Sequence, residues 1–440
     1  MTDAQIIGKI FITGELVLKS PLLISDGAGE TFDNFKDIHA LKNQSGIPFI
    51  PGTSICGVLR EEFTNSPVNK KLFGDSEKFQ SAIQIEDILL SGSKIIYRDG
   101  VKIDSLTGTG VVGGKYDYEA VERGARGNLK ILINLRGCHS KENFKVAVAE
   151  ILSKLESGIR LGALTSKGFG LATVENLNAD FYNFTKKADV ISWLTDNKDN
   201  LDKIFPAKTL FADNKNFVVD AEFSFNYSVI VRDYDISEID RKEKISAVSM
   251  KSLEDFVIPG TSLKGIFRHR AEYIFSKLNL DKKLLDNLMG TAEGDKIKSR
   301  FIVAESYMKN ENVRAISHTR NKIDRFTSGT LQGTLFSTKP IYQKNFSAPI
   351  LNIHFEIIEA KNFEVGLALF LLRDLWLGNV AIGGEKSIGR GTLKGISAKI
   401  NFSEKFYELD ASGKIIKGDA EELSKFALAI KSWGDDKCTA

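Results

Sequence analysis

The stretch Ile258-Pro259-Gly260-Thr261-Ser262-Leu263-Lys264-Gly265-Ile266-Phe267-Arg268 occurs twice in this chain in closely related form. The other copy, Ile50-Pro51-Gly52-Thr53-Ser54-Ile55-Cys56-Gly57-Val58-Leu59-Arg60, lies 208 positions earlier. Both copies contain Pro-Gly-Thr-Ser, a glycine four residues after the threonine and an arginine seven residues after it. The sequence therefore suggests one structural unit that is used twice.

Each copy predicts a strand end, a turn and the start of a helix. Pro-Gly interrupts the preceding element, and the Thr or Ser side chain can accept a hydrogen bond from the first free backbone N–H groups. A helix N-terminus suits a phosphate, and a glycine there lets another backbone approach closely. The alternative is a capped helix that only packs on a sheet. The apolar residues after the second copy fall at helical spacing: Leu263, Ile266, Phe267, Ile274, Phe275 and Leu278.

Two further motifs repeat in the same order. Lys102–Thr107 is answered by Lys322–Thr327, 220 positions later. The glycine-rich loop Gly162–Gly170 is answered by Gly383–Gly391, 221 positions later. Three matched motifs at nearly constant offsets indicate a duplicated unit of roughly 200 residues, with one domain in each half.

Each half reads as strand, helix, strands, helix and strand. Because helices and strands do not alternate regularly, this order predicts an α+β fold with an antiparallel sheet. The segment 99–126 is long, polar and rich in glycine, which predicts a projecting loop or hairpin. We expect a first domain at 1–180, a connector at 181–215, a second domain at 216–405 and a C-terminal helical tail at 406–440.

The composition is that of a globular protein, with 42% hydrophobic and 27% charged residues. The net charge is only +3, so nucleic-acid binding has to come from local patches. Cys56, Cys138 and Cys438 indicate neither a disulfide framework nor a zinc knuckle. The N-terminus does not resemble a signal peptide, and the most apolar run, Val365–Leu372, is too short to span a bilayer. We therefore expect a cytoplasmic protein.

The sequence lacks the motifs of several common cofactor, catalytic and metal sites. No segment matches the P-loop or the dinucleotide-binding fingerprint, so no nucleotide cofactor is expected. No nucleophile elbow is present. The histidines show no metal-ligand spacing, and they are His39, His139, His269, His318 and His354.

The two glycine-rich loops combine hydrogen-bond donors, cations and bare backbone. This combination suits a phosphodiester backbone that is bound without reading bases. The alternative is a tight turn with exposed cations, but each loop is paired with a Pro-Gly-Thr-Ser helix start, which favours phosphate binding. The candidate residues for backbone contacts are Thr53, Ser54, Arg60, Ser166, Lys167, Gly168, Thr261, Ser262, Lys264, Arg268, Lys386, Ser387 and Arg390.

Together these motifs resemble the RAMP superfamily of CRISPR effector proteins. The Ile-Pro-Gly-Thr-Ser-Leu-Lys-Gly-x-x-Arg stretch is similar to the family's motif after its first strand, and the two glycine-rich loops resemble its C-terminal signature. The segment from Arg98 through Ile103-Asp104 to Glu119 is similar to the central segment of type III backbone subunits, and Ile323–Thr327 resembles the same segment. The resemblance covers nearly the whole chain except 180–215 and the residues after about 405.

The resemblance implies a ferredoxin-like, RRM-like fold in each half. It implies that both units stack along a guide RNA, beside other subunits of an effector complex that binds complementary target RNA. The segments around 99–126 and 318–340 would be thumb-like hairpins that enter the guide–target duplex. Two fused units in one chain resemble the tandem subunits of the type III-D branch.

The resemblance also implies a catalytic acid. In such subunits an Asp between the first strand and the Pro-Gly-Ser/Thr motif cuts the target RNA. Counting back from Pro51-Gly52 leads to within one residue of Asp37, with Asp33 and Asp26 as rivals in the same loop. The equal count from Gly260 reaches Ile245, with Asp240 and Glu243 nearby. Asp240 is therefore the candidate acid of the second unit, and the alternative is that this unit serves as scaffold. Cys56 stands where Lys264 does in the second copy, so the first helix start has one cation fewer.

The chemistry can be argued from RNA itself. A 2′-hydroxyl attacks its own phosphate when the backbone is splayed into line, and a hairpin that kinks the target would supply this geometry. An Asp could then take the proton or hold a divalent cation such as Mg²⁺ or Mn²⁺. The alternative interpretation of Asp37 is a solvated loop carboxylate.

Three hypotheses follow. The first is an RNA-guided endoribonuclease subunit that uses Asp37. The second is a non-catalytic, guide-binding scaffold. The third is a nuclease that processes the guide precursor, for which His39 and His269 are the candidate bases.

Overall fold

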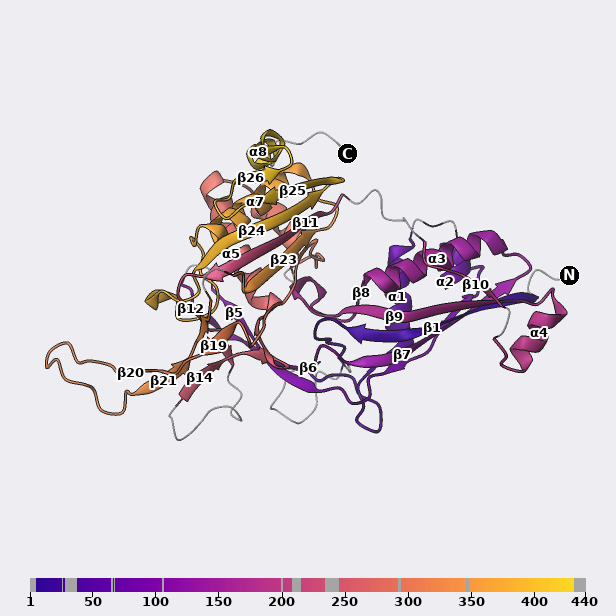
Figure 1. Ribbon diagram of the computed structural model, residues 1–440, viewed down its shortest axis with the longest axis horizontal. Coiled ribbons are helices and arrows are strands. Elements are labelled where there is room, and N and C mark those ends of the chain that lie inside the picture. Colours follow the sequence, from indigo (N-terminus) through magenta and orange to yellow (C-terminus); the bar gives the residue numbers. More distant parts are fainter. Residues whose placement is uncertain are drawn as a thin grey trace. The chain divides into compact units, whose positions relative to one another are not determined.

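The computed structural model describes residues 5–25, 27, 38–64, 66, 68–104, 107–198, 201–207, 215–233, 245–291, 294–345 and 348–430. The chain forms two compact units. Unit 1 comprises Met1–Thr165 and Phe169–Ala212, and unit 2 comprises Ser166–Gly168 and Asp213–Ala440. Each unit contains helices and a mainly antiparallel sheet (Figure 1), which confirms the predicted α+β class.

Four strands form the central sheet of unit 1, in the spatial order β9-β1-β7-β3 with antiparallel neighbours. One helical connection follows the first strand and another follows the third strand, so the chain order is βαββαβ. This order and this strand arrangement are those of a ferredoxin-like fold. The elements are β1 (Ile6–Leu18), α1 (Gly52–Glu62), α2 (Asn69–Phe73), β3 (Ile83–Ile85), β7 (Arg126–Arg136), α3 (Lys141–Ser157) and β9 (Leu171–Asn183).

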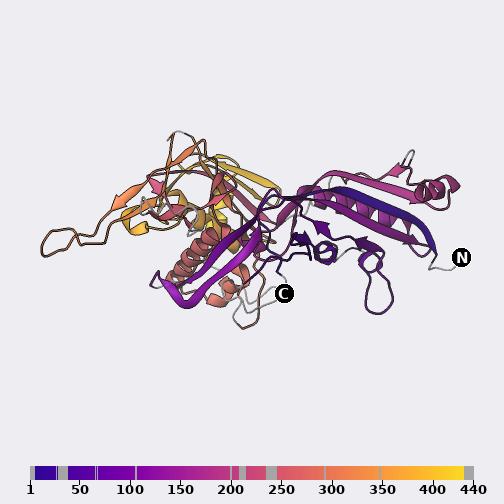
Figure 2. The same cartoon turned by 90° about the horizontal axis from the view of Figure 1, so that it is seen from below.

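The core of unit 1 lies between this sheet and α3, which runs along one sheet face (Figures 1 and 2). Alternate residues of β1, including Ile10 and Ile12, are fully buried, as expected for a strand with one face on a core. Val148 and Ile151 of α3 pack against them. The helix starts at Ser140, whose side chain accepts a hydrogen bond from the Asn143 backbone N–H.

Residues after Asn183, where we expected a connector, include α4 (Lys187–Leu194) and β10 (Asp202–Lys203), which pairs with β9. The Trp193 ring lies 5.0 Å from the Tyr182 ring, and the Lys9 ammonium lies 4.2 Å from the Trp193 ring centre. Aromatic packing and a cation–π contact therefore attach α4 to the sheet of unit 1. The shorter strands of unit 1 are β2 (Phe49–Ile50), β4 (Ile88–Leu89) and β8 (Ile159–Arg160).

Unit 2 repeats this architecture. Its sheet order is β17-β23-β11-β24, followed at the edge by β25 and β26. The elements are β11 (Phe217–Phe225), α5 (Gly260–Leu278), α6 (Lys282–Met289), β17 (Phe301–Val303), β23 (Leu351–Ile357), α7 (Asn362–Trp376) and β24 (Leu393–Phe402).

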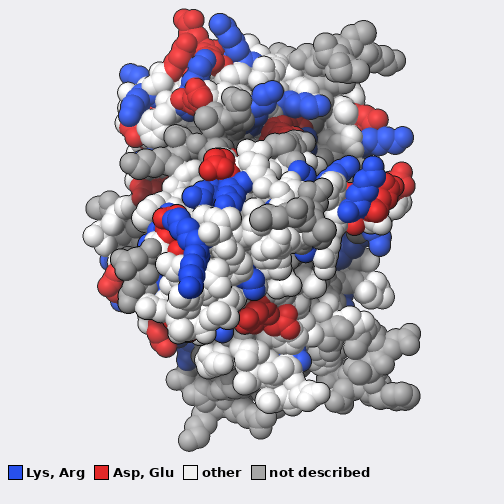
Figure 3. Space-filling model, turned by 90° about the vertical axis from the view of Figure 1, so that its right-hand side faces the viewer, with Lys and Arg blue, Asp and Glu red and all other residues white. Residues whose placement is uncertain are grey.

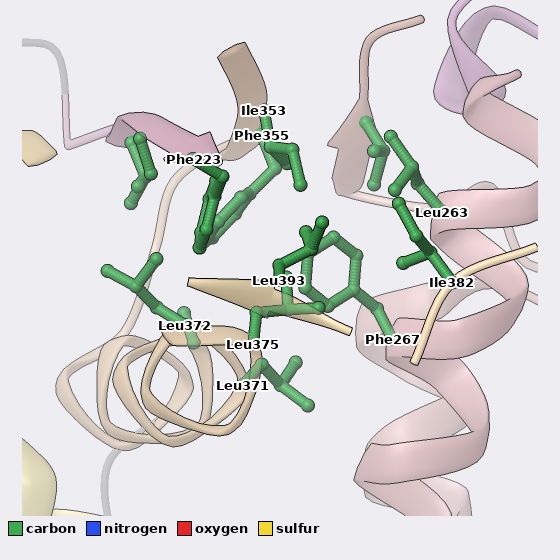
Figure 4. Packing of buried hydrophobic residues seen from close by; sticks show 14 of the residues in the cluster. Phe223, Leu263, Phe267, Ile353, Phe355, Leu371, Leu372, Leu375, Ile382 and Leu393 are labelled. Atoms are coloured by element: carbon green, nitrogen blue, oxygen red, sulfur yellow. The ribbon is translucent and has the colours of Figure 1, made fainter. Parts of the chain in front are cut away.

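The core of unit 2 is rich in aromatic residues (Figure 4). Phe267 of α5 lies 5.2 Å from the Phe355 ring of β23, and Phe301 stacks on Phe355 at 5.5 Å. Leu371 and Leu375 of α7 close the other part of the core (Figure 4). These helices therefore cover one sheet face, as the helical spacing predicted.

The C-terminal segment, where a helical tail was expected, contributes two strands as well as a helix. β25 (Lys405–Leu409) pairs with β24, β26 (Ile415–Lys417) pairs with β25, and α8 (Ala420–Ala429) packs on α7. A Cβ on Gly366 of α7 would lie 2.3 Å from the Phe426 carbonyl oxygen, so the close approach of the two helices requires glycine.

Three small sheets complete unit 2. The strands of the small sheets are β12 (Ser228–Val229), β13 (Arg232–Asp233), β14 (Ile245–Ser249), β15 (Lys251–Ser252), β16 (Asp255–Ile258), β18 (Ser306–Met308), β19 (Val313–Ala315), β20 (His318–Arg320), β21 (Phe336–Lys339) and β22 (Ile341–Gln343).

No helix in the described parts of the chain is both long and apolar enough to cross a membrane.

Candidate nucleic-acid interface

The two Pro-Gly-Thr-Ser motifs form matching helix starts. Pro51 and Pro259 are the residues before α1 and α5, with φ of −59° and −60°, and the glycine is the first helical residue. Neither start has a side-chain cap, so the expectation that Thr or Ser caps the helix is wrong. The cap position is taken by proline, which places the hydroxyls inside the first turn.

Another backbone approaches each first glycine, as expected. A Cβ on Gly52 would lie 2.1 Å from the Ile85 carbonyl oxygen, and a Cβ on Gly260 would lie 2.2 Å from that of Lys167. In unit 1 the Gly52 N–H also donates to Asp87 Oδ1 at 2.8 Å. The first glycine is therefore required by packing in both units.

Cations gather at the start of α5 in unit 2. Lys264 is buried, and its Nζ donates to Ser166 Oγ at 2.8 Å and to Ser299 Oγ at 2.7 Å. Burial, and after it the charges of Lys167 and Arg268, lower the Lys264 pKa to about 7. Burial and the Arg268 charge also lower the Lys167 pKa. Burial beside the Arg268 guanidinium thus disfavours the charged forms of Lys264 and Lys167, whereas Arg268 itself pairs with Glu272 and Asp286.

The two matched arginines have the same structural contact. Arg60 Nη2 donates to the Gly74 carbonyl at 3.2 Å, and Arg268 Nη1 donates to the Gly290 carbonyl at 2.6 Å. Gly74 and Gly290 end α2 and α6. Arg268 also pairs with Asp286. Each arginine therefore ties the motif helix to the end of the next helix.

The two glycine-rich loops have the same backbone path. Leu161 N–H donates to the Gly170 carbonyl at 2.9 Å, and Ile382 N–H donates to the Gly391 carbonyl at 2.9 Å. The loops contain the 3₁₀ turns Thr165–Lys167 and Lys386–Ile388. Gly170 and Gly391 have φ of 75° and 82°, in the left-handed region that favours glycine.

In unit 1 this loop is held by apolar packing. Phe169 is fully buried and lies edge-on to the Tyr118 ring at 5.9 Å. Leu164 and Leu23 belong to the same small cluster. Tyr118 lies on β6, so the packing fixes the loop to the base of the hairpin described below.

In unit 2 the positions of Leu164 and Phe169 are taken by Glu385 and Arg390, and the loop is held by ion pairs. The Glu385 carboxylate lies 2.7 Å from Arg320 Nη2 and 3.2 Å from Arg232 Nη2. Arg390 Nε lies 2.8 Å from Glu385 Oε2, as an ion pair without hydrogen-bond geometry. Three guanidinium groups thus share one buried carboxylate, and Arg320 belongs to β20 of the second hairpin.

A projecting hairpin was predicted in each half, and both are present. In unit 1, β5 (Ile95–Ile103) and β6 (Gly110–Val121) form a two-stranded antiparallel hairpin (Figure 2). Its apolar side chains Val101, Ile103 and Val112 are exposed. Exposed apolar groups on a hairpin suit contact with the faces of bases.

The hairpin of unit 2 joins β20 to β21 and extends away from the rest of that unit (Figure 1). Its tip carries Phe326, which is 98% exposed. An aromatic ring without protein packing suits base stacking.

The repeated Lys-Ile-Asp motif forms the turn of each hairpin. Asp104 Oδ1 accepts from the Thr107 N–H at 2.8 Å, and Asp324 Oδ1 accepts from the Thr327 N–H at 2.8 Å. Hydrogen bonds from the backbone of Thr327 and Phe326 lower the Asp324 pKa. These aspartates therefore shape the turns.

The four acids predicted to be catalytic, Asp37, Asp33, Asp26 and Asp240, lie outside the described residues. The described residues on either side of the loop that contains Asp26, Asp33 and Asp37 form backbone hydrogen bonds within unit 1. Leu41 N–H donates to the Ile24 carbonyl at 2.8 Å, and Ile38 N–H donates to the Asp117 carbonyl of β6 at 3.3 Å. The residue after Asp37 thus lies beside the base of the first hairpin.

Ionisable groups surround this point. His39 Nδ1 lies 3.7 Å from Glu119 Oε1, and Lys42 Nζ donates to Glu119 Oε2 at 3.0 Å. Asp99 faces Asp117 across the hairpin, and burial, followed by the Asp117 charge, raises the Asp99 pKa. No three His, Cys, Asp or Glu side chains among the described residues are placed to hold a metal ion.

The predicted contact residues differ in accessibility. Arg390 and Lys264 are buried, and both make internal contacts. Thr53, Arg60, Lys386 and Ser387 are exposed, whereas the other candidate side chains are partly buried and Gly168 is buried. On one face of the molecule acidic and basic side chains are interspersed (Figure 3).

Sequence reasoning missed several residues of these clusters. Ser299, Arg232, Arg320 and Glu385 lie far apart in the sequence or look like ordinary polar residues. Only the repeat offset could have drawn attention to Glu385, because it corresponds to Leu164 of the first loop.

The chain was compared with models of protein families. The sequence model of the RAMP superfamily matches residues 15–173 and 222–394. The two matched regions correspond to the two repeats, and each contains a Pro-Gly-Thr-Ser helix start, a hairpin and a glycine-rich loop. No curated protein matches the chain.

Proposed function

Because the chain belongs to the RAMP superfamily, we propose that it is a guide-RNA-binding backbone subunit of a type III CRISPR effector complex. In this proposal it positions complementary target RNA and cleaves it. Family membership itself indicates a CRISPR-associated RNA-binding protein. The tandem arrangement and its likeness to type III-D subunits belong to the proposal.

One observation carries the proposal. Each unit fixes a glycine-rich loop to the base of a projecting hairpin, through Phe169 and Tyr118 in unit 1 and through Glu385 and Arg320 in unit 2. The exposed Lys386 of the second loop suits a phosphate backbone, and the exposed apolar side chains of both hairpins suit contact with bases. Two such hairpins in one chain suit one continuous RNA.

Backbone binding is tested at Lys386, which is exposed on the second loop. Lys386→Ala should weaken guide-RNA binding about equally for all sequences and should lower the slope of log affinity against log salt by about 1. Lys417→Ala is the matched control, because Lys417 is an exposed lysine beyond the family match. An unchanged salt slope in Lys386→Ala would exclude this contact.

For cleavage, we propose Asp37 as the main catalytic carboxylate, with Asp33 and Asp26 as its rivals. The 2′-oxygen would form a bond to the phosphorus while the bond to the 5′-oxygen breaks. The Asp carboxylate would take the 2′-hydroxyl proton, and the departing 5′-oxygen would take a proton from water. The products would be a 2′,3′-cyclic phosphate and a 5′-hydroxyl. A divalent cation, if the loop carboxylates hold one, would stabilise the phosphoryl charge.

The test is a cleavage assay on the purified complex with separate target and guide-precursor substrates. Asp37→Ala should abolish one cut in the target and leave assembly intact, and a 2′-deoxynucleotide at that position should have the same effect. Asp240→Ala is the matched variant of unit 2 and should leave cutting unchanged. A chelator should stop cleavage if a cation takes part.

The other outcomes identify the alternatives. Cutting that persists at every site in Asp37→Ala, Asp33→Ala and Asp26→Ala would show that the chain is a scaffold or that a partner cleaves. Loss of precursor cutting alone, in His39→Ala or His269→Ala, would assign the processing role.

A further inference from the structure

The second glycine-rich loop exposes a surface at its tip. Ser387, Ile388 and Gly389 are exposed, and Ile388 retains 52% of its accessible area. A Cβ on Gly389 would meet no atom within 4 Å. The base of the loop is firmly held by Glu385 and Gly391, so the exposed tip is presented by a rigid frame.

The corresponding tripeptide of the first loop is covered. Ser166–Gly168 belongs to the first repeat by sequence but to unit 2 in the structure. There Ser166 Oγ accepts a hydrogen bond from Lys264 Nζ, and the Lys167 carbonyl lies against Gly260 at the start of α5. A Cβ on Gly168 would lie 2.7 Å from the Glu305 backbone nitrogen. The tripeptide thus lies on a Pro-Gly-Thr-Ser helix start.

We propose that the tip Ser387–Gly389 is the docking surface for the Pro-Gly-Thr/Ser helix start of another polypeptide built from the same repeat. The inference rests on the proposed function, since such a polypeptide would be a neighbouring subunit on the guide RNA. By the repeat offset of 221, Ser387, Ile388 and Gly389 correspond to Ser166, Lys167 and Gly168.

The covered loop specifies the chemistry of the partner. Its first helical residue has to be glycine, because the Ile388 carbonyl would approach it as the Lys167 carbonyl approaches Gly260. Three residues after the Thr or Ser that follows this glycine, it has to carry a lysine that donates to Ser387 Oγ, as Lys264 donates to Ser166. Ile388 in place of Lys167 adds apolar area to this contact.

A second copy of this chain does not meet these requirements. Its α5 start has Gly260 and Lys264, but its own Ser166–Gly168 already covers that start. Cys56 takes the place of the lysine at the start of α1. The Gly52 N–H is already bonded to Asp87, and the space beside Gly52 is filled by the Ile85 carbonyl. The partner is therefore a different polypeptide.

The experiment places a photo-reactive phenylalanine at position 388 in the full chain and purifies the assembled complex with its guide RNA. We expect a cross-link to a peptide of another subunit that contains Pro-Gly-Thr/Ser and the lysine. The same probe at Ile416, which is 62% exposed on β26, is the control and should not label that peptide. A cross-link to residues 50–60 of a second copy, to RNA alone or to a peptide without the motif would overturn the proposal, as would no cross-link.

A second measurement separates this inference from the proposed function. Ile388→Ser should weaken association of the cross-linked subunit about tenfold, with guide-RNA affinity and unfolding midpoint unchanged. Ile416→Ser is its control. If the chain does not bind guide RNA, the proposed function fails whatever Ile388→Ser does. If RNA binding is intact but Ile388→Ser leaves association unchanged, only the docking surface fails.

Discussion

The two glycine-rich loops have one backbone path and two kinds of anchor. At matched positions, unit 1 has Leu164 and Phe169 in an apolar cluster, whereas unit 2 has Glu385 and Arg390 in an ion-pair cluster. The first residue of each pair has φ of 57°. The comparison shows that the glycines determine the path, and that the anchoring pair can change chemistry if both members change together.

The physical reason is the cost of burial. A carboxylate or guanidinium that leaves water needs a partner of opposite charge, whereas two apolar side chains need only each other. A mixed pair would bury one uncompensated charge. The duplicated loops therefore kept matched pairs, and each pair still contacts the base of its hairpin through Tyr118 or Arg320.

The largest expected loss of stability comes from substituting the last glycine of each glycine-rich loop, which determines the backbone path that the two loops share. A Cβ on Gly391 would lie 1.9 Å from the Ile382 carbonyl oxygen, at a φ of 82°. Gly391→Ala should therefore destabilise unit 2 by about 4 kcal/mol in urea unfolding. Gly170→Ala should do the same to unit 1, because its Cβ would lie 1.9 Å from the Leu161 carbonyl oxygen.

Gly389→Ala is the matched control for this substitution. Gly389 has a φ of 84°, but its Cβ would meet nothing within 4 Å. It should cost only about 1 kcal/mol from the backbone conformation. Equal losses in Gly391→Ala and Gly389→Ala would show that close approach of the two loop strands is not what requires Gly391.

The second largest effect is expected from substituting the anchoring pair of the second loop, Glu385 and Arg390. Glu385→Leu removes the carboxylate from three guanidinium groups, of which Arg390 is buried, and should cost about 3 kcal/mol. The double variant Glu385→Leu/Arg390→Phe installs the pair found in unit 1 and should recover most of that loss, as measured by urea unfolding. If the double variant is no more stable than Glu385→Leu, the anchors are not interchangeable.

Acid titration provides a second readout of the same variants. Burial raises the Glu385 pKa, but the arginines outweigh this effect and hold it below the ordinary value of 4.5. The stabilisation is therefore present above about pH 4.5 and is lost as the pH falls through the lower, folded-state pKa. In the double variant, the free energy of unfolding should not show this decrease at acid pH. If the decrease is the same as in the natural protein, the proposed role of Glu385 is contradicted.

The smallest effect concerns Lys264. Its pKa falls from 10.5 in the unfolded chain to about 7 in the folded protein, chiefly through burial. Between these values the unfolded chain binds the extra proton, so stability should rise with pH from about 7 by up to about 1.4 kcal/mol per pH unit. Lys264→Met should flatten this rise in unfolding measured from pH 7 to 9, and Lys417→Met should not.

Much of the fold could be predicted because repeats and local propensities are visible in a sequence. The matched motifs predicted two α+β units, the polar, glycine-rich segment 99–126 predicted the first hairpin, and the family resemblance implied the second. The helix cap was predicted wrongly, because proline rather than a hydroxyl residue takes that position. The catalytic Asp37 stays a prediction.

The functional clusters were less visible because their members meet only in the folded chain. Arg60 and Arg268 were candidates for phosphate contacts. In the structure, each also donates a hydrogen bond to the carbonyl of the glycine that follows the next helix. Lys264 was a candidate for contacts with the RNA backbone, but it is buried and donates to two serine hydroxyls.

By itself, the sequence determined the duplication, the α+β class, the helix starts and the glycine positions, because each depends on local backbone preferences that recur at a fixed offset. Only the tertiary structure decided what surrounds each repeated motif. It brought Ser166 to Lys264 and joined Glu385 to three arginines from separate elements. Burial and charge pairing act between residues distant in the chain, so two nearly identical motifs acquired different environments.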